Sequence, residues 1–361
     1  MRIGVPTETK DQEFRVGLSP SSVRALTDRE HQVIVQAGAG LGSGFADHEY
    51  QAAGATIGTD SSAWAQELIV KVKEPLPLEY GFLRSDQLLF TYLHLAANLE
   101  LTRVLLQSKI CAVAYETVET ANHRLPLLTP MSVIAGRLAV QIGARFLERQ
   151  QGGRGVLLGG VPGVASGHVV ILGGGVVGTE AAKMAIGLGA RVTIVDVNVD
   201  RLTELEALFG SRVSLLYSTT AQIEAVVPQA DLLIGAVLVP GKKAPILVKK
   251  TVVRTMRSGS VVIDVAVDQG GCIETIRTTS HTAPTYIESG VVHYGVPNMP
   301  GAVPWTATQA LTNSTLPYVL KLADGGLGAI ETDAELLMGV NVRDGMLIHP
   351  AVRSMFPQLA S

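Results

Sequence analysis

The sequence predicts an α/β protein that consists of two doubly wound domains with parallel sheets and a cleft between them. Three observations lead to this prediction. Short apolar runs alternate with helical segments along most of the chain, and this alternation is typical of parallel sheets. The chain has 361 residues, which is too many for one ordinary hydrophobic core. Between His168 and Asp196 the sequence contains a complete strand, glycine turn, helix and second strand.

The first domain is expected to comprise residues 1–128 and 306–361. A helix should begin after Ser19, a suitable N-cap, because Pro20 suits the first turn of a helix. Near the C-terminus, Pro317 is expected to kink an apolar helix that follows the segment NMPGAVPWTAT. The expected strands are residues 2–6, 33–38, 68–73, 87–94 and 111–118, and a helix is expected near residues 98–108.

The second domain is expected to comprise residues 129–305. It should begin with a long helix over residues 129–150, because this segment is too long for a loop and lies where a connector between domains is needed. The remaining elements continue the doubly wound pattern. The expected strands are residues 169–172, 191–195, 213–218, 231–239, 260–268 and 291–296, and the expected helices are residues 201–208, 221–227 and 251–257.

The glycine turn in the second domain has the spacing G-x-G-x-x-G. Gly173 permits the tight turn, Gly175 lets a pyrophosphate approach the backbone, and Gly178 lets the helix pack closely on the strand. Asp196 ends the second strand, where a carboxylate accepts hydrogen bonds from the ribose hydroxyls of NAD. The pattern therefore predicts a Rossmann-like unit that binds NAD. A glycine-rich packing turn in an unrelated α/β domain is the alternative.

Composition limits the classes of partner. The net charge is −3 and Lys and Arg form no block longer than two residues, so no nucleic acid is expected. No uninterrupted apolar segment of about 18 residues occurs, so no membrane span is expected. The N-terminus lacks the apolar core of a signal peptide, which favours a cytoplasmic location. Cys111 and Cys272 have no metal-ligand spacing, so both are expected to be reduced core residues and no metal site is expected.

Six segments together resemble the alanine dehydrogenase family: RIGVPTETKDQEFRVGLSP, KVKEP, FTYLHLA, ILGGGVVGTEAA, DVAVDQGG and HYGVPNMPGAVP. The family also includes the N-terminal part of the proton-translocating nicotinamide nucleotide transhydrogenase. The opening GVPTE departs from the family, which commonly has lysine after the proline. The resemblance implies a homohexamer that uses NAD to convert L-alanine reversibly to pyruvate and ammonia by hydride transfer. A soluble NAD(H)-binding transhydrogenase component and a non-catalytic nucleotide sensor are the alternatives.

Four residues have the chemistry that oxidative deamination requires. By the resemblance, Arg15 binds the substrate carboxylate and Lys73 binds the carboxylate or the carbonyl. By the same resemblance, His94 is the acid/base, and Asp268 orients the substrate or exchanges protons with it. Each residue type also has a structural interpretation. Arg15 could be a surface arginine, Lys73 an ion-pair partner, His94 a hydrogen-bonded core histidine, and Asp268 a residue that holds the loop or the cofactor.

The resemblance also implies residues around the cofactor. Asn298 and Met299 would close over the substrate and nicotinamide, with Asn298 contacting both and Asp268 also contacting the cofactor. The other residues expected to line the cofactor are Ser132, Val176, Val177, Arg201, Ser218, Val237 and Leu238.

Overall fold

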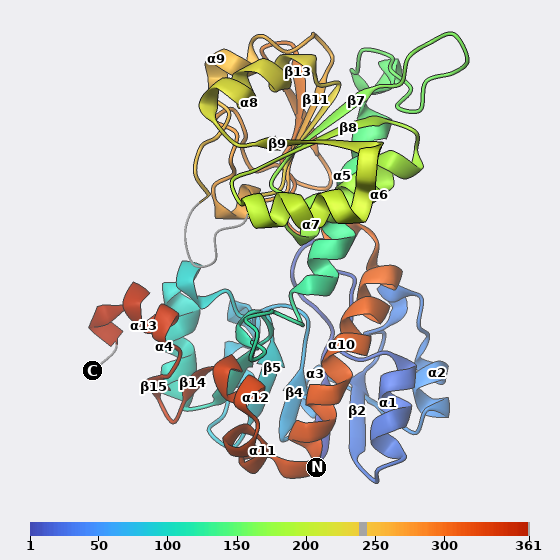
Figure 1. The fold of residues 1–361 in the computed structure, drawn as a ribbon. Helices are drawn as coiled ribbons and strands as arrows, with labels where there is room; N and C mark the ends of the chain where they lie inside the picture. Colours follow the sequence, from blue (N-terminus) through green and yellow to red (C-terminus); the bar gives the residue numbers. More distant parts are fainter. Residues whose placement is uncertain (238–243, 360–361) are drawn as a thin grey trace. The chain divides into compact units, whose positions relative to one another are not determined.

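The computed structural model describes residues 1–237 and 244–359, and the chain forms two compact units (Figure 1). Unit 1 contains Met1–Met131 and Val303–Ser361, and unit 2 contains Ser132–Ala302. The first boundary lies near the start of helix α5 (Thr129–Phe146). Unit 1 is therefore assembled from two segments that are far apart in the sequence.

Unit 1 contains an eight-stranded sheet in the order β15-β14-β6-β5-β4-β1-β2-β3. Strands β1 to β6 are parallel, and their order 3-2-1-4-5-6 is that of a doubly wound dinucleotide-binding fold. β14 pairs with β6 in the antiparallel direction and brings the C-terminal segment into the sheet. The strands are β1 (Arg2–Val5), β2 (Gln32–Gln36), β3 (Thr56–Gly58), β4 (Leu68–Val70), β5 (Leu88–Thr91), β6 (Cys111–Ala114), β14 (Val340–Arg343) and β15 (Met346–Leu347).

Helices flank the sheet of unit 1, and α10 runs across it near β4 (Figure 1). The predicted start of α1 is confirmed, because Ser19 Oγ accepts a hydrogen bond from the Ser22 N–H over 3.3 Å. α10 continues past Pro317. The helices are α1 (Pro20–Thr27), α2 (Asp47–Ala52), α3 (Asp60–Trp64), α4 (Leu99–Ser108), α10 (Pro304–Gly325), α11 (Leu327–Thr332), α12 (Ala334–Gly339) and α13 (Pro350–Met355).

Unit 2 contains a seven-stranded sheet in the order β12-β13-β11-β10-β7-β8-β9. Six strands are parallel and again follow the order 3-2-1-4-5-6, while β12 is antiparallel to β13. The strands are β7 (His168–Leu172), β8 (Arg191–Asp196), β9 (Val213–Tyr217), β10 (Leu232–Gly235), β11 (Val261–Asp264), β12 (Thr285–Glu288) and β13 (Val291–Tyr294). The helices that follow α5 are α6 (Val176–Gly187), α7 (Val199–Phe209), α8 (Thr220–Val226) and α9 (Lys250–Val253).

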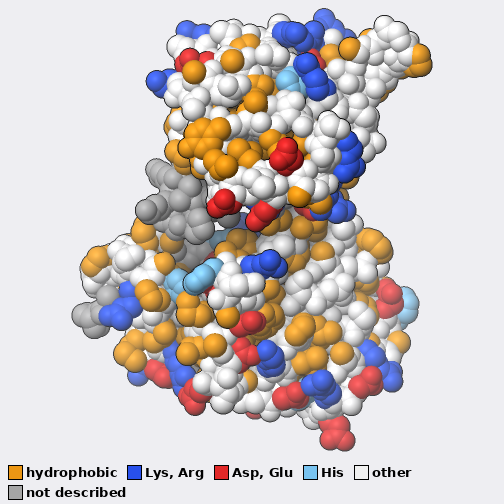
Figure 2. Space-filling view, in the orientation of Figure 1, with side chains coloured by type: hydrophobic (Ala, Val, Ile, Leu, Met, Phe, Trp, Pro, Cys, Tyr) orange, Lys and Arg blue, Asp and Glu red, His pale blue; other side chains and the backbone are white. Residues whose placement is uncertain are grey.

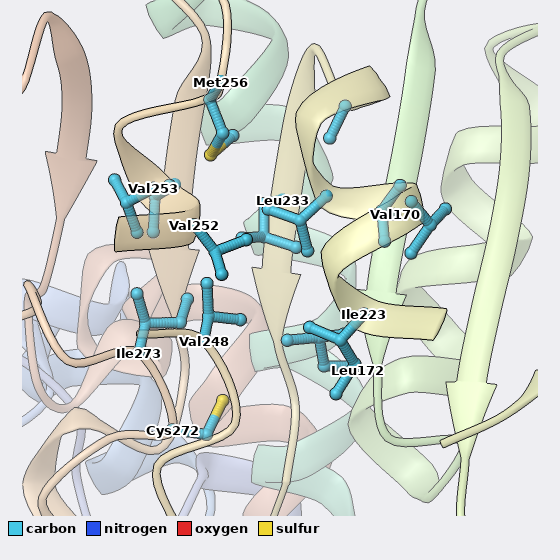
Figure 3. Packing of buried hydrophobic residues seen from close by; sticks show 14 of the residues in the cluster. Val170, Leu172, Ile223, Leu233, Val248, Val252, Val253, Met256, Cys272 and Ile273 are labelled. Atoms are coloured by element: carbon cyan, nitrogen blue, oxygen red, sulfur yellow. The ribbon is translucent and has the colours of Figure 1, made fainter. Parts of the chain in front are cut away.

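A hydrophobic cluster holds α8 and α9 against the sheet of unit 2. Figure 3 shows Ile223 of α8 and Val252 of α9 packing near Leu172 and Leu233, which belong to central strands. Burial of each large apolar side chain contributes about 1.5–3 kcal/mol to folding. Cys272 lies in the same cluster and, like Cys111, is a buried free cysteine, as the sequence predicts.

Most strands end earlier than the sequence predicts, and three of these early ends precede candidate site residues. The predictions that continued to residues 73, 94 and 268 are wrong at their carboxyl ends, because β4, β5 and β11 stop at Val70, Thr91 and Asp264. The first residue after each strand still donates to the neighbouring strand or the residues just after it, but N–H groups further along each loop bond to a carboxylate. The acceptors are Glu8 for Val72 and Lys73, Glu116 for Leu93 and His94, and Asp264 for Ala266, Cys272 and Ile273.

The surface charges bear on nucleic-acid binding, and the helix lengths bear on membrane spans. On the face that Figure 2 shows, basic and acidic side chains are interspersed, so this face has no extended basic surface of the kind that binds nucleic acid. In the described part of the chain, no helix combines the length and the apolar composition needed to cross a membrane.

Candidate active site

Polar residues follow four adjacent parallel strands of unit 1 at the same edge of the sheet. Thr91 of β5 lies beside Ala114 of β6, and Val70 of β4 lies beside Phe90 of β5. The winding direction reverses between β1 and β4, and ligands of doubly wound sheets bind at the carboxyl edge near such a point. The polar residues that follow β1, β4, β5 and β6 at this edge are Glu8, Lys73, His94 and Glu116.

Arg15 lies in the loop after β1, and Glu13 holds its guanidinium in the interior. Arg15 Nε donates to Glu13 Oε1 over 2.7 Å and Nη2 donates to Oε2 over 2.5 Å, while Nη1 lies 3.0 Å from Met131 Sδ. Burial alone lowers the pKa of Arg15, but the hydrogen bonds and charge of Glu13 raise it above its usual value. The structure therefore contradicts the surface interpretation of Arg15, because only 2% of the residue is exposed.

Lys71 and Lys73 have different surroundings. Lys71 Nζ lies 2.7 Å from Glu79 Oε1 and 3.5 Å from Glu8 Oε2, and these charges raise its pKa despite burial. Lys73 forms no ion pair with any residue in the described ranges. Burial lowers the pKa of Lys73, and the nearby Arg15 charge lowers it further. Lys71 is thus the structural ion-pair residue, whereas Lys73 is a buried amine that an anionic ligand would stabilise in its charged form.

His94 lies beyond the end of β5, and its side chain is 45% exposed. This exposure contradicts the interpretation of His94 as a core residue. Its imidazole lies parallel to the Tyr92 ring, with centroids 5.8 Å apart and an interplanar angle of 3°. Lys73 Nζ lies 5.8 Å from the centroid of the same Tyr92 ring. The Tyr92 ring therefore lies near both His94 and Lys73. The Tyr92 hydroxyl donates a 2.6 Å hydrogen bond to the Leu127 carbonyl, which fixes the position of the ring.

A pocket of about 280 Å³ opens beside Arg15 in unit 1. Its lining includes Arg15 and Glu13 but neither Lys73 nor His94. Of the candidate substrate residues Arg15, Lys73 and His94, the pocket therefore reaches only Arg15. Its other lining residues are Thr7, Glu8, Lys10, Gln12, Phe14, Gly38, Ala39 and Gly42.

The glycine turn of unit 2 has the geometry that a dinucleotide requires. Gly173 has a φ of +97°, which favours glycine. A Cβ on Gly178 would lie 1.9 Å from the Gly173 carbonyl oxygen, so only glycine lets α6 pack this closely. A Cβ on Gly175 would meet nothing within 4 Å. The turn thus leaves open space beside the N-terminus of α6, where backbone N–H groups bind phosphate.

Asp196 and Arg201 both contact this turn. Asp196 Oδ2 accepts the Gly174 N–H over 2.6 Å, so the carboxylate lies directly beside the turn. Arg201 Nε donates to the Gly174 carbonyl over 2.7 Å and Nη2 donates to Thr179 Oγ1 over 2.8 Å. Arg201 Nη1 pairs with Glu204. Arg201 therefore braces the turn from α7, and the group as a whole fits NAD.

The remaining residues expected at the cofactor have fewer contacts with the glycine turn. Ser218 follows β9, and its N–H donates to the Asp196 carbonyl over 2.9 Å, so the two residues lie at the same sheet edge. Val237 follows β10, and its Cγ2 lies 3.2 Å from the point that a Cβ on Gly173 would occupy. Ser132 lies on α5, and Val176 and Val177 begin α6. Leu238 lies outside the described residues.

Asp268 lies in a short 3₁₀ segment (Val267–Gln269) and is exposed. Asp264 shapes the loop that carries it, because its buried carboxylate accepts N–H groups from Ala266 over 3.0 Å and from Cys272 over 2.7 Å. Burial raises the pKa of Asp264. The loop thus presents Asp268 from the carboxyl end of β11.

Asn298 and Met299 lie in the loop before α10. Asn298 has a φ of +57°, a left-handed conformation that asparagine adopts more readily than most residues. Its carbonyl accepts the Gly301 N–H over 2.9 Å, and Met299 is buried. The loop therefore has a defined turn.

Sequence reasoning missed five residues that organise these groups: Glu8, Glu13, Tyr92, Glu116 and Asp264. Glu8 and Glu116 could have been found as polar residues that follow apolar strands at one sheet edge. Asp264 lies within the predicted strand and Tyr92 within an apolar run, so neither had a distinguishing signal. Among the residues with described positions, no group of three or more His, Cys, Asp and Glu side chains could hold a metal ion.

Two family models match most of the chain. The N-terminal domain of the family described as alanine dehydrogenase/PNT matches residues 4–135, and its C-terminal domain matches residues 139–350. The chain belongs to the alanine dehydrogenase/PNT family. The resemblance identified from the sequence motifs is therefore confirmed.

Relatives in this family match over nearly their whole length. Alanine dehydrogenase from Bacillus subtilis (strain 168) is 54% identical over 98% of this chain and 94% of the relative. A solved L-alanine dehydrogenase is 68% identical, with a TM-score of 0.98 and complete coverage of both chains. A transhydrogenase structure from Sinorhizobium meliloti is 25% identical, with a TM-score of 0.83, and covers 97% of this chain and 100% of its own. The two-domain Rossmann-like α/β fold expected from the sequence is confirmed.

Proposed function

We propose that this chain is an alanine dehydrogenase, which converts L-alanine and NAD⁺ reversibly to pyruvate, ammonia and NADH. The main support is that Arg15, Lys73 and His94 follow adjacent strands at the carboxyl edge of one sheet, in a chain that is 54% identical to a curated alanine dehydrogenase over nearly its full length. Two cations suit a carboxylate, and an exposed imidazole suits proton exchange.

The substrate is held by unit 1 in this proposal. Arg15 binds the carboxylate with a planar guanidinium that Glu13 orients. Lys73 binds the carboxylate or the carbonyl oxygen, and the negative charge of the substrate favours the protonated amine that burial disfavours. Both cations also anchor the carboxylate as charge shifts at C2 during imine formation and hydride transfer.

His94 exchanges protons with the water and carbinolamine that connect the imine to pyruvate, and Asp268 assists in proton exchange and contacts the cofactor. Asn298 contacts the substrate and nicotinamide, and Met299 covers them.

Bound NAD⁺ supplies the acceptor for the hydride that leaves Cα of alanine. The turn formed by Gly173, Gly175 and Gly178 would hold the pyrophosphate beside Gly175, and Asp196 would accept hydrogen bonds from the ribose hydroxyls. The other residues proposed to line the cofactor are Ser132, Val176, Val177, Arg201, Ser218, Val237 and Leu238.

We further propose a cytoplasmic homohexamer that acts in L-alanine catabolism. The support is family membership. The alternative function, a soluble NAD(H)-binding component of a transhydrogenase, has weaker support, because the transhydrogenase structure is 25% identical and the alanine dehydrogenase structure is 68% identical.

The deciding experiment measures NADH oxidation with pyruvate, 2-oxobutyrate and glyoxylate, each with and without ammonium. An alanine dehydrogenase should oxidise NADH with pyruvate only when ammonium is present. His94→Ala should slow this reaction by about a hundredfold or more while leaving NADH binding intact. Hydride exchange with a second nucleotide, without ammonium-dependent turnover, would favour the transhydrogenase component.

A further inference from the structure

The backbone around His94 has an unusual conformation. His94 has a φ of +49°, in the left-handed region that L-residues seldom adopt. It is followed at once by a short 3₁₀ helix, η3 (Leu95–Ala97), in which the Ala97 N–H donates to the His94 carbonyl over 3.1 Å. The direction of the imidazole is therefore determined by this turn as well as by its side-chain rotamer.

The Glu116 carboxylate occupies the inside of the turn. Its Oε1 accepts the His94 N–H over 2.6 Å, and both carboxylate oxygens lie 3.2 Å from the Leu93 nitrogen, which donates to them. Successive N–H groups in a turn with one left-handed residue converge on a single point and form an anion-binding concavity. Glu116 fills this concavity from the adjacent strand, because it lies just after β6.

The same carboxylate lies near the imidazole. Glu116 Oε1 is 3.9 Å from His94 Nδ1, and the Glu116 side chain is 18% exposed, whereas that of His94 is 45% exposed. Glu116, the less exposed of the two residues, thus holds the more exposed His94 by the His94 backbone. The Tyr92 ring lies parallel to the His94 imidazole. Among the described carboxylates, Glu116 is the one with an oxygen within 4.0 Å of a His94 ring nitrogen.

We propose that Glu116 is a positioning residue for His94: it stabilises the left-handed turn that points the imidazole toward the substrate. This inference rests on the proposed role of His94 in the dehydrogenase reaction. Glu116 acts through the His94 backbone and has no direct contact with the reacting atoms. Its loss should therefore lower kcat more than it changes NADH binding.

The first test compares Glu116→Ala, Glu116→Gln and the control Glu119→Gln. Glu119 lies three residues later and pairs with His123 in an exposed part of the loop, so its substitution preserves the turn. Glu116→Ala should lower kcat by at least about tenfold, with the NADH dissociation constant changed less than about twofold. Glu116→Gln should be intermediate, because its amide oxygen still accepts the His94 N–H. Glu119→Gln should keep wild-type rates.

A double-mutant cycle shows whether Glu116 acts through His94. Adding Glu116→Ala to His94→Ala should reduce kcat no further, since the group being positioned is already absent. A further tenfold loss in the double mutant would overturn the proposal, as would full kcat in Glu116→Ala.

A spectroscopic measurement separates this proposal from the proposed function. The chain has eight histidines. In protein labelled with ¹³C at the histidine Cε1, the His94 signal is the one that disappears in His94→Ala. It should move in Glu116→Ala and stay in place in Glu119→Gln. An unmoved signal in Glu116→Ala would overturn the positioning role, whereas absence of dehydrogenase turnover in the wild type would overturn the proposed function alone.

Discussion

Carboxylates hold the functional groups of unit 1 at defined positions. Glu13 forms a two-pronged contact with Arg15, Glu116 accepts the backbone N–H of His94, and Glu8 accepts those of Val72 and Lys73. A buried carboxylate without partners would be costly, so each of these contacts also stabilises the carboxylate that makes it. The candidate substrate residues are therefore oriented by groups that need not touch the substrate themselves.

Arg15→Lys is expected to lower kcat/KM for pyruvate by at least about tenfold, because a lysine cannot reproduce the planar two-pronged contact with Glu13. Steady-state kinetics at saturating NADH and ammonium give the measurement. Arg24→Lys is the matched control, since Arg24 pairs with Asp28 on the exposed surface of α1. Wild-type kcat/KM in Arg15→Lys would remove Arg15 from the substrate site.

Asp196 is expected to make NADH the preferred cofactor over NADPH by at least about tenfold in kcat/KM, because its charge repels a 2′-phosphate. Arg201 does not offset this effect, since its donors are directed to the glycine turn, Thr179 and Glu204. Asp196→Ala should narrow the difference. Equal use of NADH and NADPH by the wild type would contradict the ribose assignment.

At the scale of elements, different glycines of the turn serve helix packing and cofactor binding. Gly178→Ala would place a Cβ 1.9 Å from the Gly173 oxygen, so α6 must shift and the melting temperature should fall. Gly175→Ala should leave the melting temperature unchanged, because its Cβ meets open space and its φ of −65° suits alanine. It should nevertheless weaken NADH binding by at least about tenfold, since the methyl group enters the proposed phosphate site. Thermal unfolding and NADH titration of both variants test this, and unweakened binding by Gly175→Ala would contradict the site.

The opposite edge of the unit 2 sheet contains a pH-sensitive group. Burial, with the nearby Arg191 charge, lowers the pKa of His168 from 6.5 to about 4, and its Nε2 lies 2.8 Å from Thr193 Oγ1. His168 is therefore harder to protonate in the folded state than in the unfolded state. The free energy of unfolding should not be reduced by His168 above pH 6.5. It should decrease as the pH falls toward 4, by about 3 kcal/mol in total.

Urea unfolding of His168→Gln between pH 7 and pH 4 measures this contribution. The variant should lose less stability on acidification than the wild type, whereas His123→Gln, which alters an exposed histidine, should follow the wild type. The same acid dependence in His168→Gln and the wild type would show that His168 is not its source.

The structure also shows which elements local sequence patterns can predict. The glycine turn, its two strands and the helix between them depend on contacts within about thirty residues, and their prediction is confirmed. β3, β12, β14 and β15 were not predicted, because these short strands, at or next to a sheet edge, are specified by the partners they pair with. The positions of Lys73 and His94 beyond their strands depend on the distant carboxylates of Glu8 and Glu116, which strand periodicity cannot reveal.

At the scale of the whole molecule, light scattering at several protein concentrations tests the proposed hexamer. The expected mass is about six times that of one chain, which is 38.0 kDa. The mass should change little on dilution if the assembly is stable. A mass near that of one chain at every concentration would contradict the proposal, while the catalytic assignments could still be tested independently.

The division of unit 1 between the two ends of the sequence has a consequence during synthesis. β6 is a buried strand whose partner, β14, is translated only after all of unit 2. Until then the nascent N-terminal segment has an unpaired sheet edge, a feature that promotes association between chains. Unit 2 can complete its sheet first, because its strands are contiguous in the sequence. We therefore expect unit 1 to be the last part to reach its native state on the ribosome and the part that most needs protection by chaperones.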